Sequence, residues 1–135
     1  MLQPSRRKYR KEFRGSMAGI ATRGNQLSFG EFGIKATSCG WVTAAEIESA
    51  RRTITHHTKR IGKLFTRVFP HKPFTKKAAG ARMGSGKADI AGYVAVVKPG
   101  QILFELTGVK RSLAQEAIRL AGHKLSVSTR FIEKI

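Results

Sequence analysis

The segment between Lys76 and Gly92 constrains the fold most, because it offers a hydrophobic core almost nothing to bury. Its only large apolar residues are Met83 and Ile90, among four glycines and four basic residues. Glycine backbone approaches a ligand closely and presents N–H groups to an anion. A segment of this composition does not bury enough apolar surface to order itself. We therefore expect a loop that a polyanion orders. Taken alone, the segment also fits the alternative of a solvated mobile loop.

The nearest catalytic motif to this segment is the Walker A loop of nucleotide hydrolases. That motif requires Gly, four residues, Gly, Lys and then Ser or Thr, between a strand and a helix. Here Gly86-Lys87 has Ala81 at the first glycine position and Ala88 where the hydroxyl must bind Mg²⁺. The acidic residues are also too scattered for a metal-binding carboxylate pair. The sequence predicts a protein that is not an enzyme and has no cofactor.

The formal net charge of +18 on 135 residues indicates a polyanionic partner. No acidic residue occurs between Ser49 and Ala88, although a solvated surface normally mixes both signs. A membrane is not the expected partner, because no apolar run approaches the roughly 18 residues that span a bilayer. Cys39 is the single cysteine and the histidines lack ligand spacing, so no metal site is expected. Nucleic acid is therefore the expected partner. Recognisable DNA-binding motifs are missing, but charge alone leaves a DNA-architectural protein open as an alternative.

The first sixteen residues are strongly basic, with Tyr9 and Phe13 interleaved among the cations. A disordered tail is one interpretation of such an N-terminus. The interleaved aromatic rings favour an arm that becomes ordered on RNA, where rings stack on bases and cations bind phosphates. We predict a basic arm over residues 1–16 and a single RNA-binding domain over residues 17–135. The predicted RNA-binding residues of the arm are Arg6, Arg7, Lys8, Arg10, Lys11 and Arg14.

Two helices are predicted, each beginning with a capping-box pattern. The first starts at Thr43, whose partner is Glu46, carries an apolar stripe through Ile61 and ends at Gly62. The second starts at Ser112, whose partner is Gln115, and ends near residues 122–124. The buried face expected for the second helix consists of Leu113, Ala117, Leu120 and Ala121. The first helix and the residues after it carry predicted RNA-binding cations at Arg51, Arg52, Lys59, Arg60 and Lys63.

Alternating apolar residues predict several short strands around these helices. They fall within residues 26–41, 64–69 and 125–135, and a hairpin is expected from 93–97 and 102–106 with its turn at 98–101. The strand at 64–69 is expected to end at Pro70-His71-Lys72-Pro73. The glycine-rich segment then projects between two strands as a loop over residues 75–92. Together these elements predict an α+β fold, with antiparallel sheets and two helices packed on one side.

Six ordered motifs resemble one family. The sequence begins Met-Leu-Gln-Pro with basic residues through Phe13-Arg14-Gly15, and continues with five further motifs at consistent spacing. These are Leu27-Ser28-Phe29-Gly30, Ile47-Glu48-Ser49-Ala50-Arg51-Arg52, Arg67-Val68-Phe69-Pro70 with Lys72-Pro73, Arg82-Met83-Gly84-Ser85-Gly86-Lys87, and Val96-Val97-Lys98-Pro99-Gly100 with Ile102-Leu103-Phe104-Glu105. Over essentially its whole length the chain resembles the large-subunit ribosomal protein L-sixteen family of bacteria and organelles.

This resemblance implies a structural component of the large ribosomal subunit that binds its large rRNA. It implies further partners in the 5S rRNA region, the aminoacyl-site tRNA and neighbouring ribosomal proteins. The family's loop helps to shape the peptidyl-transferase region without catalysing its reaction. That loop corresponds here to Arg82, Met83, Gly84, Ser85, Gly86 and Lys87, and the lysines before it, Lys76 and Lys77, are predicted to bind RNA with it. The implied location is the ribosome, in the bacterial cytoplasm or alternatively in a mitochondrion or plastid.

Overall fold

A computed structural model describes residues 2–6, 8–9, 11–76, 86 and 90–134. Within these residues, two helices are interspersed with short strands, and no regular element occurs before residue 32. The order is β1 Phe32–Ala36, β2 Gly40–Thr43, α1 Ala44–His57, β3 Lys63–Thr66, β4 Lys72–Thr75, β5 Ile90–Val97, β6 Ile102–Thr107, α2 Arg111–Gly122 and β7 Thr129–Glu133.

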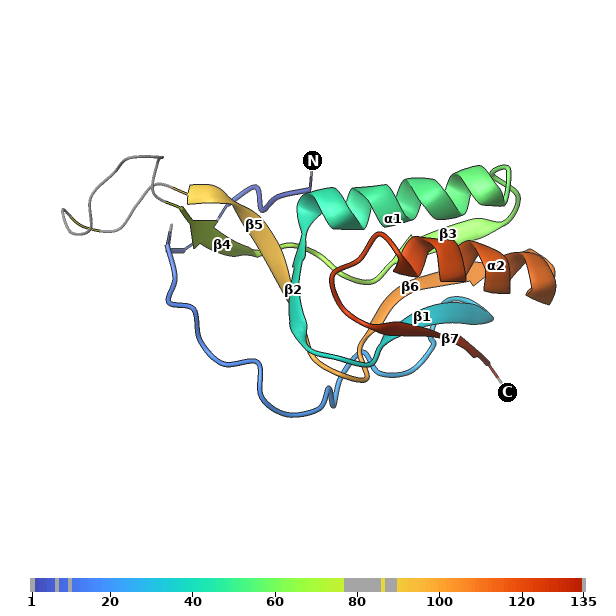
Figure 1. Cartoon of the computed structure of the whole chain (residues 1–135), viewed down its shortest axis with the longest axis horizontal. Helices are drawn as coiled ribbons and strands as arrows, with labels where there is room; N and C mark the ends of the chain where they lie inside the picture. The colour runs from blue at the N-terminus through green and yellow to red at the C-terminus, as the bar shows by residue number, and fades with distance from the viewer. Residues whose placement is uncertain (1, 7, 10, 77–85, 87–89, 135) are drawn as a thin grey trace.

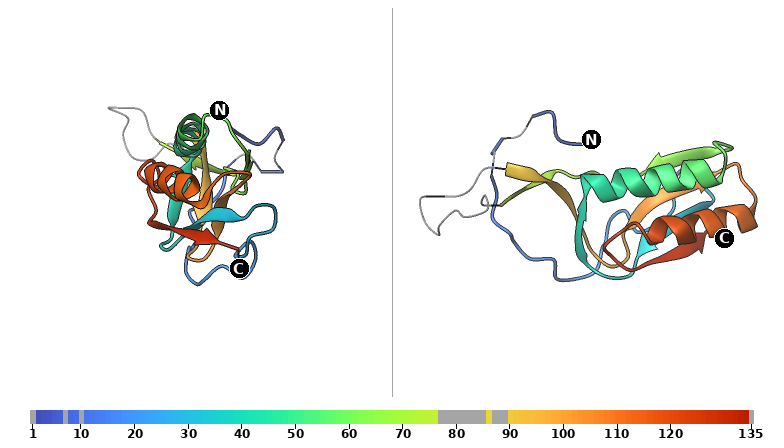
Figure 2. Two further views of the ribbon diagram at one scale, coloured as in Figure 1. Left: turned by 90° about the vertical axis from the view of Figure 1, so that its right-hand side faces the viewer. Right: turned by 45° about the horizontal axis from the view of Figure 1, so that its top comes forward.

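The strands form two antiparallel sheets, and the helices lie side by side against them (Figure 1). One sheet has four strands in the order β3-β6-β1-β7, and the other has three in the order β2-β5-β4. The three-stranded sheet extends toward one end of the molecule, where β4 ends and β5 begins, as two further views also show (Figure 2). The predicted α+β fold with antiparallel sheets is confirmed.

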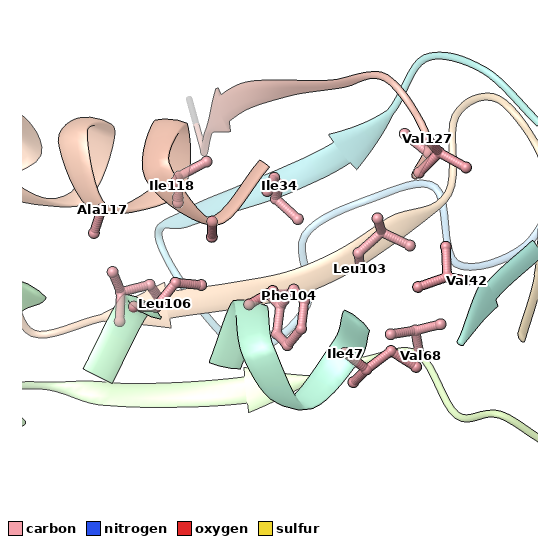
Figure 3. Packing of buried hydrophobic residues seen from close by; sticks show 14 of the residues in the cluster. Ile34, Val42, Ile47, Val68, Leu103, Phe104, Leu106, Ala117, Ile118 and Val127 are labelled. Atoms are coloured by element: carbon pink, nitrogen blue, oxygen red, sulfur yellow. The ribbon is translucent and has the colours of Figure 1, made fainter. Parts of the chain in front are cut away.

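The core lies between the helices and the strands (Figure 3). On the four-stranded sheet, Ile34 of β1 pairs in register with Phe104 of β6, and both are buried. Burial of a large aliphatic or aromatic side chain contributes about 1.5–3 kcal/mol, so a cluster of this size drives folding. The helices and the three-stranded sheet add Val42, Ile47, Ala50, Ile54, Ala95, Val97, Ala114, Ala117, Ile118 and Ala121.

Helix α1 begins with the capping box that the sequence predicts. The Thr43 hydroxyl accepts from the N–H of Glu46 at 3.2 Å, and the Glu46 carboxylate accepts from the N–H of Thr43 at 3.2 Å. The predicted end of this helix is wrong, because α1 stops at His57 and Ile61 is 56% exposed. The Thr58 hydroxyl donates to the Ile54 carbonyl, and the next two residues adopt positive φ, which turns the chain away from the helix axis.

The predicted hairpin of 93–97 with 102–106 is wrong, because β5 and β6 belong to different sheets. Their connection bonds to β1 instead: the N–H of Gly100 donates to the Ala36 carbonyl, and the N–H of Ala36 donates to the Gln101 carbonyl, both at 2.8 Å. Gly100 has a φ of +98°, which suits a glycine turn. The turn is therefore real, but it carries the chain from one sheet into the other.

Four further expectations differ from the structure, the last of them in part. No strand forms over residues 26–31, and the N–H groups of Ser28, Phe29 and Gly30 bind a buried carboxylate instead. Lys72 and Pro73, expected to terminate a strand, belong to β4. The second capping box is absent, since α2 has Lys110 at its N-cap with no side-chain hydrogen bond. Ala117 and Ala121 are buried as expected, whereas Leu113 and Leu120 are half-buried, and Ala114 and Ile118 complete the buried face.

Candidate nucleic-acid interface

The outer surface of α1 holds Arg51 and Arg52, and both form ion pairs with Glu48. The Nε of Arg51 lies 3.0 Å from one carboxylate oxygen, and the Nε of Arg52 lies 3.2 Å from the other. The hydrogen bond from Arg51 is the main reason that the pKa of Glu48 falls to about 2. Glu48 therefore stays ionised at neutral pH and offsets part of the charge of this predicted RNA-binding pair.

The turn after α1 presents two exposed cations. Lys59 and Arg60 are exposed, and in the part of the chain that the structure describes neither forms an ion pair. Their φ values are +54° and +61°, a conformation that costs a residue with a side chain about 1–2 kcal/mol. Backbone hydrogen bonds hold it: the N–H of Lys59 donates to the His56 carbonyl, and that of Arg60 to the Thr55 carbonyl.

Helix α1 and the turn after it together line a basic concavity with a volume of about 560 Å³. The structure thus brings three predicted RNA-binding arginines together, although Arg60 lies beyond the end of the helix that carries the other two. The residues that line this basic concavity are Arg51, Arg52, Thr55, His56 and Arg60.

A larger groove of about 820 Å³ runs between α1 and α2. The sequence does not indicate this groove, because His123 and Lys124 follow α2 and come close to α1 only when the two helices pack together. His56 and His57 both line it. The polar lining of this groove consists of Glu48, Ser49, Arg52, Thr53, His56, His57, His123 and Lys124.

Part of the predicted arm lies against the three-stranded sheet. The ammonium group of Lys72 donates to the carbonyl of Arg14, and residues 12–14 line a hollow of about 240 Å³ together with β4 and Trp41. Tyr9 is 65% exposed, with the ammonium of Lys8 at 5.6 Å from its ring centroid. Arg6 and Lys8 are exposed and Lys11 is half-buried, while Arg7 and Arg10 lie outside the described residues.

The predicted loop is described only where it leaves and re-enters the sheet and at Gly86. Lys76 is exposed, and Gly86 is exposed with a φ of +85°. At the base of the loop, Thr75 of β4 pairs with Ile90 of β5, so both ends are fixed to one sheet. The remaining predicted site residues of this segment lie outside the described residues: Lys77, Arg82, Met83, Gly84, Ser85 and Lys87.

A buried carboxylate on the four-stranded sheet holds the segment that precedes β1. Glu105 of β6 accepts hydrogen bonds from the N–H groups of Ser28, Phe29 and Gly30 at 2.8, 2.9 and 3.0 Å. It also pairs with Arg67 at 2.9 Å. Burial opposes ionisation of Glu105, but these hydrogen bonds outweigh it and hold its pKa below the usual range. Arg67 therefore stabilises the fold, and Glu105 neutralises its charge within the protein.

The described residues form neither a metal site nor a membrane-spanning helix. Among them, no three His, Cys, Asp or Glu residues are grouped so that they could hold a metal ion. No helix among the described residues is long and apolar enough to cross a membrane.

Comparison with known protein families identifies the family of this chain. The family model described as ribosomal protein L16p/L10e matches residues 4–132. The chain belongs to the L16p/L10e family of ribosomal proteins. Members of this family are structural constituents of the large ribosomal subunit, so this chain is a ribosomal protein that binds rRNA and contacts neighbouring ribosomal proteins. The match covers most of the predicted arm, both helices and every strand up to the last residue of β7, and it confirms the resemblance inferred from the six sequence motifs.

Proposed function

We propose that this L16p/L10e member is held in folded large-subunit rRNA by three basic parts: the arm over residues 1–16, the end of α1 with its turn, and the loop between β4 and β5. Residues 17–135 form the domain that positions the other two. The observation on which this rests is the turn after α1, where Lys59 and Arg60 are exposed beside the basic concavity and have no ion pair among the residues that the structure describes. Cations without an internal partner are available to neutralise phosphates.

Binding is electrostatic in this account. Each phosphate that a lysine or arginine neutralises releases bound counterions, which adds about 0.7–0.9 to the slope of log K against log salt. The predicted site residues are numerous, so we expect a steep slope. Glu48 lowers the contribution of Arg51 and Arg52, because rRNA must compete with the carboxylate for both guanidinium groups.

We further propose that the loop reaches the aminoacyl-tRNA site near the peptidyl-transferase centre, close to the 5S rRNA region, in a ribosome of bacterial or organellar type. The support is the sequence Arg82-Met83-Gly84-Ser85-Gly86-Lys87, together with the fixed strand ends at Thr75 and Ile90. Glycine backbone and two cations suit close contact with RNA. The chain supplies position and charge there, and it performs no chemical step.

A filter-binding titration of the full chain against purified large-subunit rRNA tests the proposal, with duplex DNA as the competitor. We expect a steep salt dependence and preference for the folded rRNA. A shallow slope, or equally strong competition by duplex DNA, would contradict it and favour a general DNA-binding role.

The loop's assignment has its own test in reconstituted large subunits. Arg82→Ala should leave the thermal melt of the free protein unchanged and weaken tRNA binding at the aminoacyl site. Arg119→Ala is the matched control, because Arg119 lies on α2 and is paired with Glu116. Unchanged tRNA binding by Arg82→Ala would remove the loop from that site.

A further inference from the structure

Two phenylalanine rings form a stacked pair on the side of the four-stranded sheet where Glu105 lies. Phe29 comes from the segment before β1 and Phe65 from the edge strand β3, and their centroids are 5.3 Å apart with an interplanar angle of 25°. Phe29 is 61% exposed and Phe65 is half-buried. Core formation does not explain Phe29, since most of its surface remains in water. Exposed aromatic pairs of this kind are typical of binding surfaces.

The exposed ring is held in place by the fold. The N–H groups of Ser28, Phe29 and Gly30 all donate to the buried carboxylate of Glu105, which fixes the backbone on both sides of the ring. Gly30 seats this segment tightly, because a Cβ there would lie 2.8 Å from the Leu106 carbonyl oxygen. A ring positioned in advance loses little conformational entropy when a partner stacks on it.

Cations lie beside both rings. The ammonium of Lys63 lies 5.2 Å from the centroid of Phe65, and the guanidinium carbon of Arg67 lies 5.5 Å from that of Phe29. Arg67 is neutralised by Glu105, whereas Lys63 is exposed and forms no ion pair among the described residues. An aromatic surface with an available cation matches a nucleotide, whose base is flat and apolar and whose phosphate is negative.

We propose that Phe29 and Phe65 form a stacking site for an unpaired base of the large-subunit rRNA, with Lys63 binding an adjoining phosphate. This proposal rests on the proposed rRNA-binding function and gives it a second component. The cations of the arm, turn and loop act on phosphates, while the ring pair selects a place on the folded rRNA where a base is unstacked and accessible.

Filter binding of the full chain to purified large-subunit rRNA tests this site with Phe29→Leu and Phe29→Tyr. Phe29→Leu keeps an apolar side chain but removes the ring, and we expect affinity to fall about fivefold to a hundredfold. The salt slope should not change, because no charge is lost. Phe29→Tyr should bind like the wild type. Phe69→Leu, at another partly exposed ring, is the matched control and should also bind like the wild type.

The outcomes separate the two proposals. Wild-type affinity for Phe29→Leu, with a steep salt slope intact, would overturn the stacking site alone. Equal weakening by Phe29→Leu and Phe29→Tyr would also overturn it. If Phe29→Leu binds purified rRNA normally but fails to enter assembling subunits, the rings contact a neighbouring protein and the proposal is wrong. Failure of the wild type to bind rRNA would overturn the proposed function itself.

Discussion

Arg60 and Arg67 lie close in the sequence but use their charges in opposite ways. Arg67 pairs with buried Glu105 and donates to the Gln26 carbonyl at 2.7 Å, and its side chain is only 19% exposed. Arg60 sits in an exposed turn, and in the described part of the chain it has no acidic partner. The difference shows that a count of cations overestimates the charge available to RNA. Glu48 teaches the same lesson at Arg51 and Arg52.

The largest loss of stability is expected from a charge at Ile54, in the core beneath the exposed turn. Ile54 is fully buried, and its carbonyl accepts from both the N–H and the hydroxyl of Thr58. Ile54→Asp buries an unpaired charge, so we expect a loss of about 4 kcal/mol or more and an unfolded chain in thermal melts followed by circular dichroism. Ile61→Asp, at a 56% exposed position, should melt near the wild-type temperature. The reverse ranking would mean that core and surface are assigned wrongly.

Glu105→Gln directly removes the ion pair that neutralises Arg67. This change leaves Arg67 without its carboxylate and places an amide against backbone N–H groups, so we expect a loss of about 3–5 kcal/mol. Glu31→Gln is the control, because Glu31 is exposed and its carboxylate accepts only from the Thr107 hydroxyl among the described residues. Similar denaturant midpoints for the two variants would contradict an organising role for Glu105.

The same residue predicts a pH dependence of stability. The folded-state pKa of Glu105 lies below its unfolded value, so its contribution is complete above about pH 4.3 and is lost as pH falls through the folded pKa. The stability gap between the wild type and Glu105→Gln should therefore narrow on acidification. A gap that stays constant from neutral pH into the acid range would count against an ionised Glu105.

A smaller effect separates the stability of α1 from its charge. Thr43→Ala removes the cap at the helix start and should cost about 1 kcal/mol in urea unfolding while leaving the salt slope of rRNA binding unchanged. Ser112→Ala should change stability far less, because α2 has no side-chain cap. Equal losses in the two variants would restore the capping box that the sequence predicts at Ser112.

Local chemistry accounts for what could be predicted from the sequence. The capping box at Thr43, the apolar stripe through Ile47 and Ile54, and the turn at Gly100 all follow from interactions between near neighbours, and all are present. The α+β class follows from the periods of the apolar residues.

Tertiary contacts account for what could not be predicted. The turn at Gly100 does not specify which strand receives its hydrogen bonds, so the division of β5 and β6 between two sheets was not accessible. The segment from Ser28 to Gly30 has a strand-like pattern, but its N–H groups donate to the Glu105 carboxylate of β6. Arg67 belongs to the acid-free stretch between Ser49 and Ala88, but the sequence does not show that Glu105 neutralises it. Nor does the sequence show that His123 lies next to α1.

The most direct test of the account is the salt dependence of rRNA binding by a variant that removes the unpaired charges of the turn. Lys59→Gln with Arg60→Gln should lower the slope of log K against log salt by about 1.4–1.8, since each cation contributes about 0.7–0.9. Arg119→Gln, which removes a cation already paired with Glu116, should leave the slope close to that of the wild type. An unchanged slope in the double variant, or an equal fall in the control, would contradict the claim that unpaired cations bind the rRNA.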